Sequence, residues 1–286
     1  MAISKTAEYV AFYRALETLE PRREPLFRDP YASLFVNRGL ALELRLARIR
    51  PLYEPVTRAV DRRAPGARLA AAARTRFIDD LTEQAAARGL AQLVLVGAGF
   101  DCRAHRLSGL RSLPVFEVDR EAELSVKRAR LDGTRLPVRA DVRYAAAELG
   151  TDDLERPLAR AGFDAARSAL IVLEGVLNYL SEANAERLLA WAGHAAKGST
   201  VVFSYLDRRV LDGTFAGAED VTRAMRDARE PWRSGFAPDD LARVLRALGL
   251  VTMEDLGSDA YRARYLGPEP GASRFSFYRL AVAEVC

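Results

Sequence analysis

Cysteine and histidine are scarce in this chain of 286 residues, which has two of each. Cys102 and Cys286 are too few for a disulfide framework or a cysteine zinc site, and two histidines argue against a histidine-rich metal site, so we expect no metal. Apolar runs of about 18 residues are lacking, and the first residues have no signal-peptide core. The sequence therefore predicts neither export nor a membrane span, and a cytoplasmic location.

A strong charge imbalance is also lacking, because the net charge is +4 and the pI is near 9.2. The arginines are spread through predicted helices among glutamates and alanines, a pattern typical of a solvated surface rather than a nucleic-acid patch. We expect no nucleic-acid partner and no membrane partner. The positive balance predicts only a mild preference for anionic small molecules.

Residues 1–90 are predicted to form a helical extension that packs on the rest of the chain. Apolar residues at helical spacing predict a first helix over residues 4–19. Asp29 and Pro30 suit the N-cap and first position of another, and a long helical tract follows to residue 88. Breaks in this tract are predicted near Pro51, Pro55 and Pro65.

From residue 91 onward, apolar runs alternate with helical patterns, which predicts a Rossmann-like, mostly parallel sheet with crossover helices. Seven strands are predicted, over residues 91–96, 115–119, 136–144, 169–174, 200–205, 251–256 and 275–282. The last two should form an antiparallel hairpin. Residues 91–206 are then the cofactor-binding core, residues 207–238 an inserted cap over the ligand crevice, and residues 239–286 the C-terminal part of the sheet.

Glycines and acids gather at one edge of this predicted sheet. Gly97 and Gly99 follow the first strand and permit a tight turn against a ligand. Asp119 ends the second strand about 20 residues later, the spacing at which a carboxylate can bind ribose hydroxyls. Asp141 and Glu174 are predicted at the ends of two further strands. Several acids on one edge favour an adenosine-bearing ligand.

Cys102 stands where a dinucleotide fold needs its third glycine, so pyrophosphate suits this turn poorly. A carboxylate-rich pocket instead tolerates the sulfonium of S-adenosylmethionine, which favours methyl transfer. An NAD-dependent oxidoreductase is the first alternative, although no Tyr-x-x-x-Lys relay is evident. A non-catalytic protein that only binds the cofactor is the second.

Six short motifs stand out along residues 4–206. They read Ser4-Lys5-Thr6-Ala7, Asp29-Pro30-Tyr31-Ala32, Ala73-Arg74-Thr75-Arg76-Phe77-Ile78-Asp79, Val96-Gly97-Ala98-Gly99-Phe100-Asp101-Cys102-Arg103, Phe116-Glu117-Val118-Asp119 and Leu173-Glu174-Gly175-Val176-Leu177-Asn178-Tyr179-Leu180. Together they resemble the motifs of the leucine carboxyl methyltransferase family and its bacterial relatives, which methylate carboxylates of proteins or natural products. The resemblance implies a class I methyltransferase fold, with S-adenosylmethionine as cofactor and S-adenosylhomocysteine as product.

The resemblance also implies a role for each cofactor-binding position. These are Arg74 for the methionyl carboxylate, Glu174 for its amino group, Gly97 beside Gly99 under the methionyl portion, Asp119 for the ribose, Asp141 with Val142 for the adenine, and Lys5 nearby. The chemistry agrees with two of these roles, because arginine matches a carboxylate bidentately and an acid matches an ammonium.

The methyl acceptor is expected to be a small, anionic natural-product molecule that carries a carboxylate. A carboxylate is ionised at neutral pH, so its methylation needs alignment rather than a base. Arg143 is the candidate anchor for the acceptor carboxylate, and Tyr179 and Tyr205 are candidates to line its pocket. If the acceptor is a hydroxyl instead, His105 is the candidate base. The acceptor's identity, a protein acceptor and the oligomeric state stay open.

Overall fold

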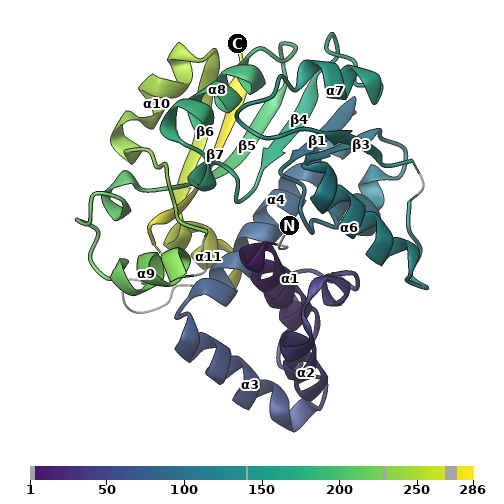
Figure 1. The fold of residues 1–286 in the computed structure, drawn as a ribbon, viewed down its shortest axis with the longest axis vertical. Helices are drawn as coiled ribbons and strands as arrows, with labels where there is room; N and C mark the ends of the chain where they lie inside the picture. The colour runs from purple at the N-terminus through teal and green to yellow at the C-terminus, as the bar shows by residue number, and fades with distance from the viewer. Residues whose placement is uncertain (1–3, 140, 228–229, 268–275) are drawn as a thin grey trace.

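The computed structural model describes residues 4–139, 141–227, 230–267 and 276–286 as one α/β fold around a seven-stranded sheet (Figure 1). The strands are β1 (Gln92–Val96), β2 (Val115–Asp119), β3 (Arg143–Ala146), β4 (Ala169–Leu173), β5 (Thr200–Leu206), β6 (Leu250–Gly257) and β7 (Tyr278–Val285). Their order is β3-β2-β1-β4-β5-β7-β6, with β1 to β5 parallel and β7 antiparallel to both neighbours. The predicted fold class, including the final antiparallel hairpin, is confirmed.

Helices cover both faces of the sheet, as the continuous apolar runs of β1 and β4 require, because every residue of these two strands is buried. One face packs against α7 (Glu155–Arg160), α8 (Glu182–Gly193) and α10 (Pro238–Ala247). The other packs against α4 (Ala67–Ala87), α5 (Arg103–Arg106) and α11 (Ser258–Leu266). The helix α6 (Glu121–Asp132) follows β2 and contacts β3.

The N-terminal helices α1 (Lys5–Thr18), α2 (Arg38–Ala47) and α3 (Arg50–Arg63) form a separate apolar cluster with the start of α4. The Asp29 carboxylate accepts from the backbone N–H groups of Tyr31 and Ala32, but the element that follows is a short 3₁₀ turn, Ala32–Phe35, whose N-cap is Tyr31 rather than the predicted Asp29. Pro55 does not break the chain as predicted. It lies inside α3, exposed and near the helix start, where it removes one helical hydrogen bond.

Two further elements differ from the sequence prediction. The third strand, predicted over residues 136–144, is β3 at Arg143–Ala146, because the guanidinium of Arg139 bonds the backbone carbonyls of Leu110 and Leu113 and holds the preceding segment outside the sheet. The helix α11 was missed, and it packs on α4.

The predicted cap is partly helical, with a 3₁₀ turn at Arg208–Val210 and the helix α9 (Glu219–Asp227). The division into extension, core and cap stays a prediction. Among the helices of the described segments, none is both long and apolar enough to span a bilayer.

Candidate functional site

The turn after β1 and the end of β2 meet at the carboxyl edge of the sheet. Gly97 and Gly99 have φ of +64° and +40°, and a Cβ on Gly97 would lie 2.4 Å from Cγ2 of Val176, so only glycine fits there. The backbone N–H groups of Gly99 and Arg120 each donate to one oxygen of Asp119 at 2.8 Å. The Asp119 carboxylate is therefore fixed beside the glycine turn, as predicted from the spacing.

Two arginines hold the carboxylate that follows β4. Nε of Arg74 donates to Oε1 of Glu174 at 2.8 Å, and Nη2 of Arg103 donates to Oε2 at 3.0 Å. Burial disfavours the ionised form of Glu174, but Arg74 and Arg103 outweigh it and lower the pKa of Glu174 to about 2. Glu174 also helps to raise the pKa of Arg74, against the effect of burial. The family resemblance assigned Arg74 and Glu174 to one site, and the structure joins the two side chains directly.

Arg103 extends this site into a buried charge network that sequence reasoning missed. Its guanidinium also pairs with Asp101 and with Asp79, the latter at 3.3 Å. Arg106 donates to both oxygens of Asp79 at 2.6 and 2.7 Å. The signal was present, since Asp79, Asp101 and Arg103 all stand in the quoted motifs, but long-range pairing cannot be read from spacing along the chain.

The helix α1 is tied to the glycine turn through Arg14. Its Nε donates to Asp29 at 2.9 Å, and its Nη2 donates to the backbone carbonyl of Phe100 at 2.5 Å. Phe100 also stacks on Phe35 with ring centroids 4.7 Å apart. The N-terminal extension therefore supports the turn directly.

The last strand contributes an aromatic wall to the same edge. The guanidinium carbon of Arg74 lies 5.0 Å from the ring centroid of Tyr278, whose hydroxyl donates to Oδ1 of Asn178 at 3.2 Å. Behind it, Phe277 makes edge contacts with Phe215 and Trp232, each with centroids 5.6 Å apart. These aromatic residues could not be assigned to the site from the sequence, because they belong to no motif and come together only in the folded chain.

The cap is joined to the start of α1. The carboxylate of Glu230 accepts from the backbone N–H groups of Lys5 at 2.7 Å and Thr6 at 3.0 Å, and also from the Thr6 hydroxyl. Tyr179 lies beside Thr6 and Trp232, and burial raises its pKa to about 12. The structure thus brings Tyr179 and the backbone of Lys5 together, while the Lys5 residue itself is exposed.

The placement of Asp141 and Val142 at the carboxyl edge is wrong. Both residues precede β3, at its amino end, and the exposed Asp141 pairs with Arg139 at 2.6 Å, which lowers the pKa of Asp141. The carboxyl end of β3 is followed instead by residues 147–149. The N–H of Ala147 donates to the Asp119 carbonyl at 3.0 Å, and a Cβ on Gly97 would meet Leu149 Cδ1 at 3.3 Å. Leu149 therefore occupies the place predicted for Val142.

Of the acceptor candidates, Arg143 lies away from this edge, and Tyr205, at the carboxyl end of β5, has its hydroxyl engaged by another residue. Arg143 begins β3 opposite Phe116, three residues before the Asp119 pairing, or about 10 Å along the strand. Its Nη1 donates to the carbonyl of Gly162 at 3.1 Å. Tyr205 is buried, and its hydroxyl bonds the Asp255 carboxylate at 2.8 Å. The expected position of Arg143 at the carboxyl edge is therefore wrong, and the acceptor role of Tyr205 stays a prediction.

His105 does not suit the role of base. Burial, assisted by the nearby Lys127 and Arg139, lowers its pKa to about 4. Its Nδ1 accepts from the backbone N–H of Arg139 at 3.4 Å, and its ring lies 5.8 Å from the Tyr31 ring. The imidazole is therefore neutral at pH 7, weakly basic, and packed against the segment that leads to β3.

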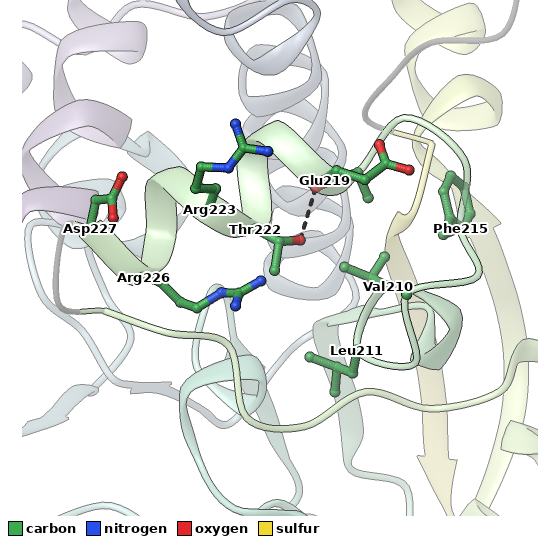
Figure 2. Close-up of a pocket in the computed structure, with 10 residues that line it drawn as sticks. Val210, Leu211, Phe215, Glu219, Thr222, Arg223, Arg226 and Asp227 are labelled. Atoms are coloured by element: carbon green, nitrogen blue, oxygen red, sulfur yellow. Dashed lines mark hydrogen bonds between the residues drawn. The ribbon is translucent and has the colours of Figure 1, made fainter.

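A cavity of about 340 Å³ lies in the cap, between the turn at residues 208–213 and α9. Its lining is Val210, Leu211, Gly213, Phe215, Ala218, Glu219, Thr222, Arg223, Arg226 and Asp227. Figure 2 shows the Arg226 side chain reaching from α9 toward Val210 and Leu211. In the described chain, no ion pair holds Arg226. The cavity thus combines an apolar wall with two arginines, Arg223 and Arg226, and two carboxylates, Glu219 and Asp227.

Within the described residues, no group of three or more histidine, cysteine or acidic side chains is arranged to hold a metal ion.

Comparison with known proteins gives a consistent result. A family model described as leucine carboxyl methyltransferase matches residues 7–193. A predicted S-adenosyl-L-methionine-dependent methyltransferase of Streptomyces coelicolor is 37% identical, over 84% of this chain and 84% of its own length. Another from Frankia alni is 35% identical, over 85% of this chain and 81% of its own length. Among solved structures, a predicted methyltransferase of Thermobifida fusca YX has a TM-score of 0.61 at 18% identity, covering 96% of this chain and 94% of its own, which shows the shared fold.

Proposed function

The chain belongs to the leucine carboxyl methyltransferase family, and we propose that it transfers a methyl group to a carboxylate oxygen of a small, anionic acceptor. It is an S-adenosylmethionine-dependent methyltransferase, so the NAD-dependent alternative is set aside. The finer assignment, a methyl ester as product, rests on the titratable groups at the carboxyl edge. Among the described residues at this edge, the acids and the tyrosine are already engaged or protonated, as is the Glu230 carboxylate, which accepts from Lys5 and Thr6.

Three groups at this edge could be considered as a general base. Glu174 is held by two arginines, which lower its own pKa to about 2. The Asp119 carboxylate already accepts two backbone hydrogen bonds. Tyr179 is protonated at neutral pH, since its pKa is about 12. A hydroxyl acceptor would need one of them to remove a proton. A carboxylate acceptor is ionised already, so this site suits it better.

The residues at the edge fit S-adenosylmethionine by their chemistry. Its methionyl end is a zwitterion, and the Arg74–Glu174 pair offers a cation for the carboxylate and an anion for the ammonium. Among the described residues, Arg74 uses only Nε for hydrogen bonding, so its two terminal nitrogens can donate to the methionyl carboxylate. We assign Asp119 to the ribose hydroxyls and Leu149 to the adenine, because both lie beside the glycine turn. When bound, the cofactor supplies an electrophilic methyl group on a sulfonium.

The acceptor side of the proposal rests on the cap. Tyr179 and Trp232 cover the edge, and the Glu230 carboxylate ties the cap to the start of α1. This cover would exclude water from the reacting oxygen. The aromatic wall of Phe277 and Phe215 continues from Tyr278 to the cap cavity. We assign this cavity to the apolar body of the acceptor. Arg226 then attracts its negative charge, in place of the Arg143 predicted from sequence.

The test is an assay with S-adenosylmethionine labelled in its methyl group against matched carboxylic acids, phenols and alcohols. We expect volatile, alkali-labile label from the carboxylic acids, because mild alkali hydrolyses methyl esters and leaves methyl ethers intact. Arg226→Gln should raise KM for anionic acceptors, and Arg243→Gln, an exposed arginine of α10 paired with Asp240, is the control. Alkali-stable products would instead assign a hydroxyl acceptor. Cofactor binding without turnover across the panel would indicate a non-catalytic protein.

A further inference from the structure

The helices α2 and α3 form a hairpin that projects from the bottom of the molecule in Figure 1, away from the sheet. The helix α2 is apolar on two opposite sides. Its inner stripe, buried against α1 and α3, consists of Leu40, Leu44 and Ala47. Its outer stripe has the same spacing and consists of Leu42, Leu46 and, at the tip, Ile49, which are 57%, 40% and 52% exposed. The outer stripe is not needed for packing within the chain.

The exposed apolar surface continues onto α3. Leu52 is 37% exposed, and it joins Leu46 in lining a groove of about 380 Å³ between the two helices. The other apolar residues of the groove are Pro55, Val56 and Ala59. Scattered single leucines are ordinary on a surface, but a contiguous aliphatic ridge and groove on one projection indicate an interaction site.

The hairpin also carries the positive charge of the protein. Residues 38–63 contain seven arginines and three acidic residues, a net charge of +4 that equals the net charge of the whole chain. The acids are already paired: Glu43 with Arg63, Glu54 with Arg58, and Asp61 with Arg68. Arg45 and Arg48 flank the exposed stripe and have no ion-pair partner among the described residues. A partner of this surface should therefore be anionic.

We propose that the α2–α3 hairpin binds the surface of an anionic lipid bilayer. Leu46, Ile49 and Leu52 enter the boundary between headgroups and acyl chains, and Arg45 and Arg48 contact lipid phosphates. The tip suits this environment because three of its backbone N–H groups are bonded within the hairpin. Arg48 N–H donates to Leu44 O at 3.1 Å, Ile49 N–H to Leu46 O at 3.0 Å, and Leu52 N–H to Ile49 O at 2.7 Å.

Other occupants fit the same surface less well. A second copy of the chain would bring one hairpin of charge +4 against another, which is repulsive. Protein interfaces favour aromatic residues at their centres, whereas this ridge is aliphatic. The proposal departs from the expectation that no membrane is bound, which rested on the lack of a spanning segment. Binding at the surface needs no such segment.

The test is co-sedimentation of the full chain with vesicles of phosphatidylcholine alone and of phosphatidylcholine mixed with phosphatidylglycerol. We expect binding to the anionic vesicles only, weakening as salt rises. Replacing Leu46, Ile49 and Leu52 with serine should abolish it. Met253→Ser, which removes a side chain 57% exposed on β6, is the matched control and should bind as the parent does. Arg45→Gln and Arg48→Gln should each weaken binding about fivefold.

Four results would overturn the proposal. The first is no sedimentation with anionic vesicles, and the second is equal binding by the serine variant and the Met253→Ser control. The third is a dimer in vesicle-free solution that the serine substitutions dissociate, which would make a second copy the occupant. The fourth is binding to polyglutamate but not to vesicles, which would indicate an acidic protein partner. Equal thermal stabilisation of all variants by S-adenosylhomocysteine checks that they are folded, and the vesicle result is independent of the methyl acceptor.

Discussion

Replacing Glu174 with glutamine removes one negative charge from between two buried arginines while keeping the side chain's size. The side chains of Arg74 and Arg103 are 9% and 2% exposed, so neither can turn to bulk water when its partner is neutralised. Arg103 keeps Asp101 and Asp79 as counter-charges, whereas among the described residues Arg74 has no second ion pair and keeps its contact with the Tyr278 ring. The loss of the Glu174 charge should therefore destabilise Arg74 more than Arg103.

The size of the stability change follows from the pKa of Glu174, which falls from an ordinary 4.5 to about 2 in the folded protein. A shift of this size corresponds to about 3 kcal/mol at neutral pH. Because the folded pKa is the lower one, this stabilisation is complete above the unfolded pKa and is lost as the pH falls from about 4.5 toward 2. The Glu174→Gln variant should be about 3 kcal/mol less stable at pH 7. Its stability should also lack the loss that the parent shows as the pH falls from about 4.5 toward 2.

The same substitution should weaken cofactor binding, since the proposed partner of the methionyl ammonium becomes neutral. A hydrogen bond between charged groups contributes about 1.5 to 3 kcal/mol, so S-adenosylhomocysteine should bind roughly tenfold to a hundredfold more weakly. Urea unfolding at neutral and acidic pH measures the stability, and titration calorimetry measures the affinity.

The matched control is Glu17→Gln in the helical extension. Glu17 is also fully buried and held by an arginine, because both of its oxygens accept from Arg23 at 2.7 Å, but it lies outside the site. This variant should lose stability and keep the parent affinity for S-adenosylhomocysteine. An unchanged affinity in Glu174→Gln would refute the assignment of the ammonium site. An unchanged stability would show that the arginine pairs contribute nothing net.

Three further predictions concern residues whose environment the structure defines. The His105 ring should titrate in NMR with a midpoint near 4, and its stabilisation, complete above about 6.5, should be lost as the pH falls toward 4; a midpoint above 6 would contradict its burial. Of the two thiols, the exposed Cys286 should react quickly with a disulfide reagent and the buried Cys102 only on unfolding, because burial raises the pKa of the Cys102 thiol; two fast thiols would contradict this packing. Tyr205→Phe should cost about 1 to 2 kcal/mol of stability through its lost bond to Asp255 and leave kcat unchanged, whereas a lower kcat at unchanged stability would return Tyr205 to the acceptor pocket.

Most of the sheet could be predicted because buried parallel strands leave a plain signal. Residues 115–119 match β2 without error, since an apolar run there ends in an acid and is bounded by Pro114 and a helix start. The third strand failed for a long-range reason. Residues 136–144 alternate in a strand-like way, but the Arg139 side chain binds carbonyls at Leu110 and Leu113, and no pattern within the segment records that contact.

The error in the third strand carried over into the site. The residues expected at the end of a strand depend on where the strand is predicted to end. Because the third strand was predicted a few residues too early, the adenine contacts were expected at Asp141 and Val142. The structure shows that the carboxyl edge lies after Ala146 and brings Leu149 next to Gly97. Gly97, Gly99 and Asp119 were placed correctly because the features that define them, a glycine turn and a strand-ending acid, are local.

The arginines are the part of the site for which composition was most misleading. Their spread along the chain was interpreted as a solvated surface, yet the side chains of four arginines are almost wholly buried and pair with four acids from separate segments. The arginines are Arg14, Arg74, Arg103 and Arg106, and the acids are Asp29, Asp79, Asp101 and Glu174. Such a network connects α1, α4, the glycine turn and β4, so a charge change at any one acid reaches the cofactor edge. Glu174 is the member that also faces the proposed ligand. Its substitution therefore tests the network and the site with one change, and Glu17→Gln separates the two.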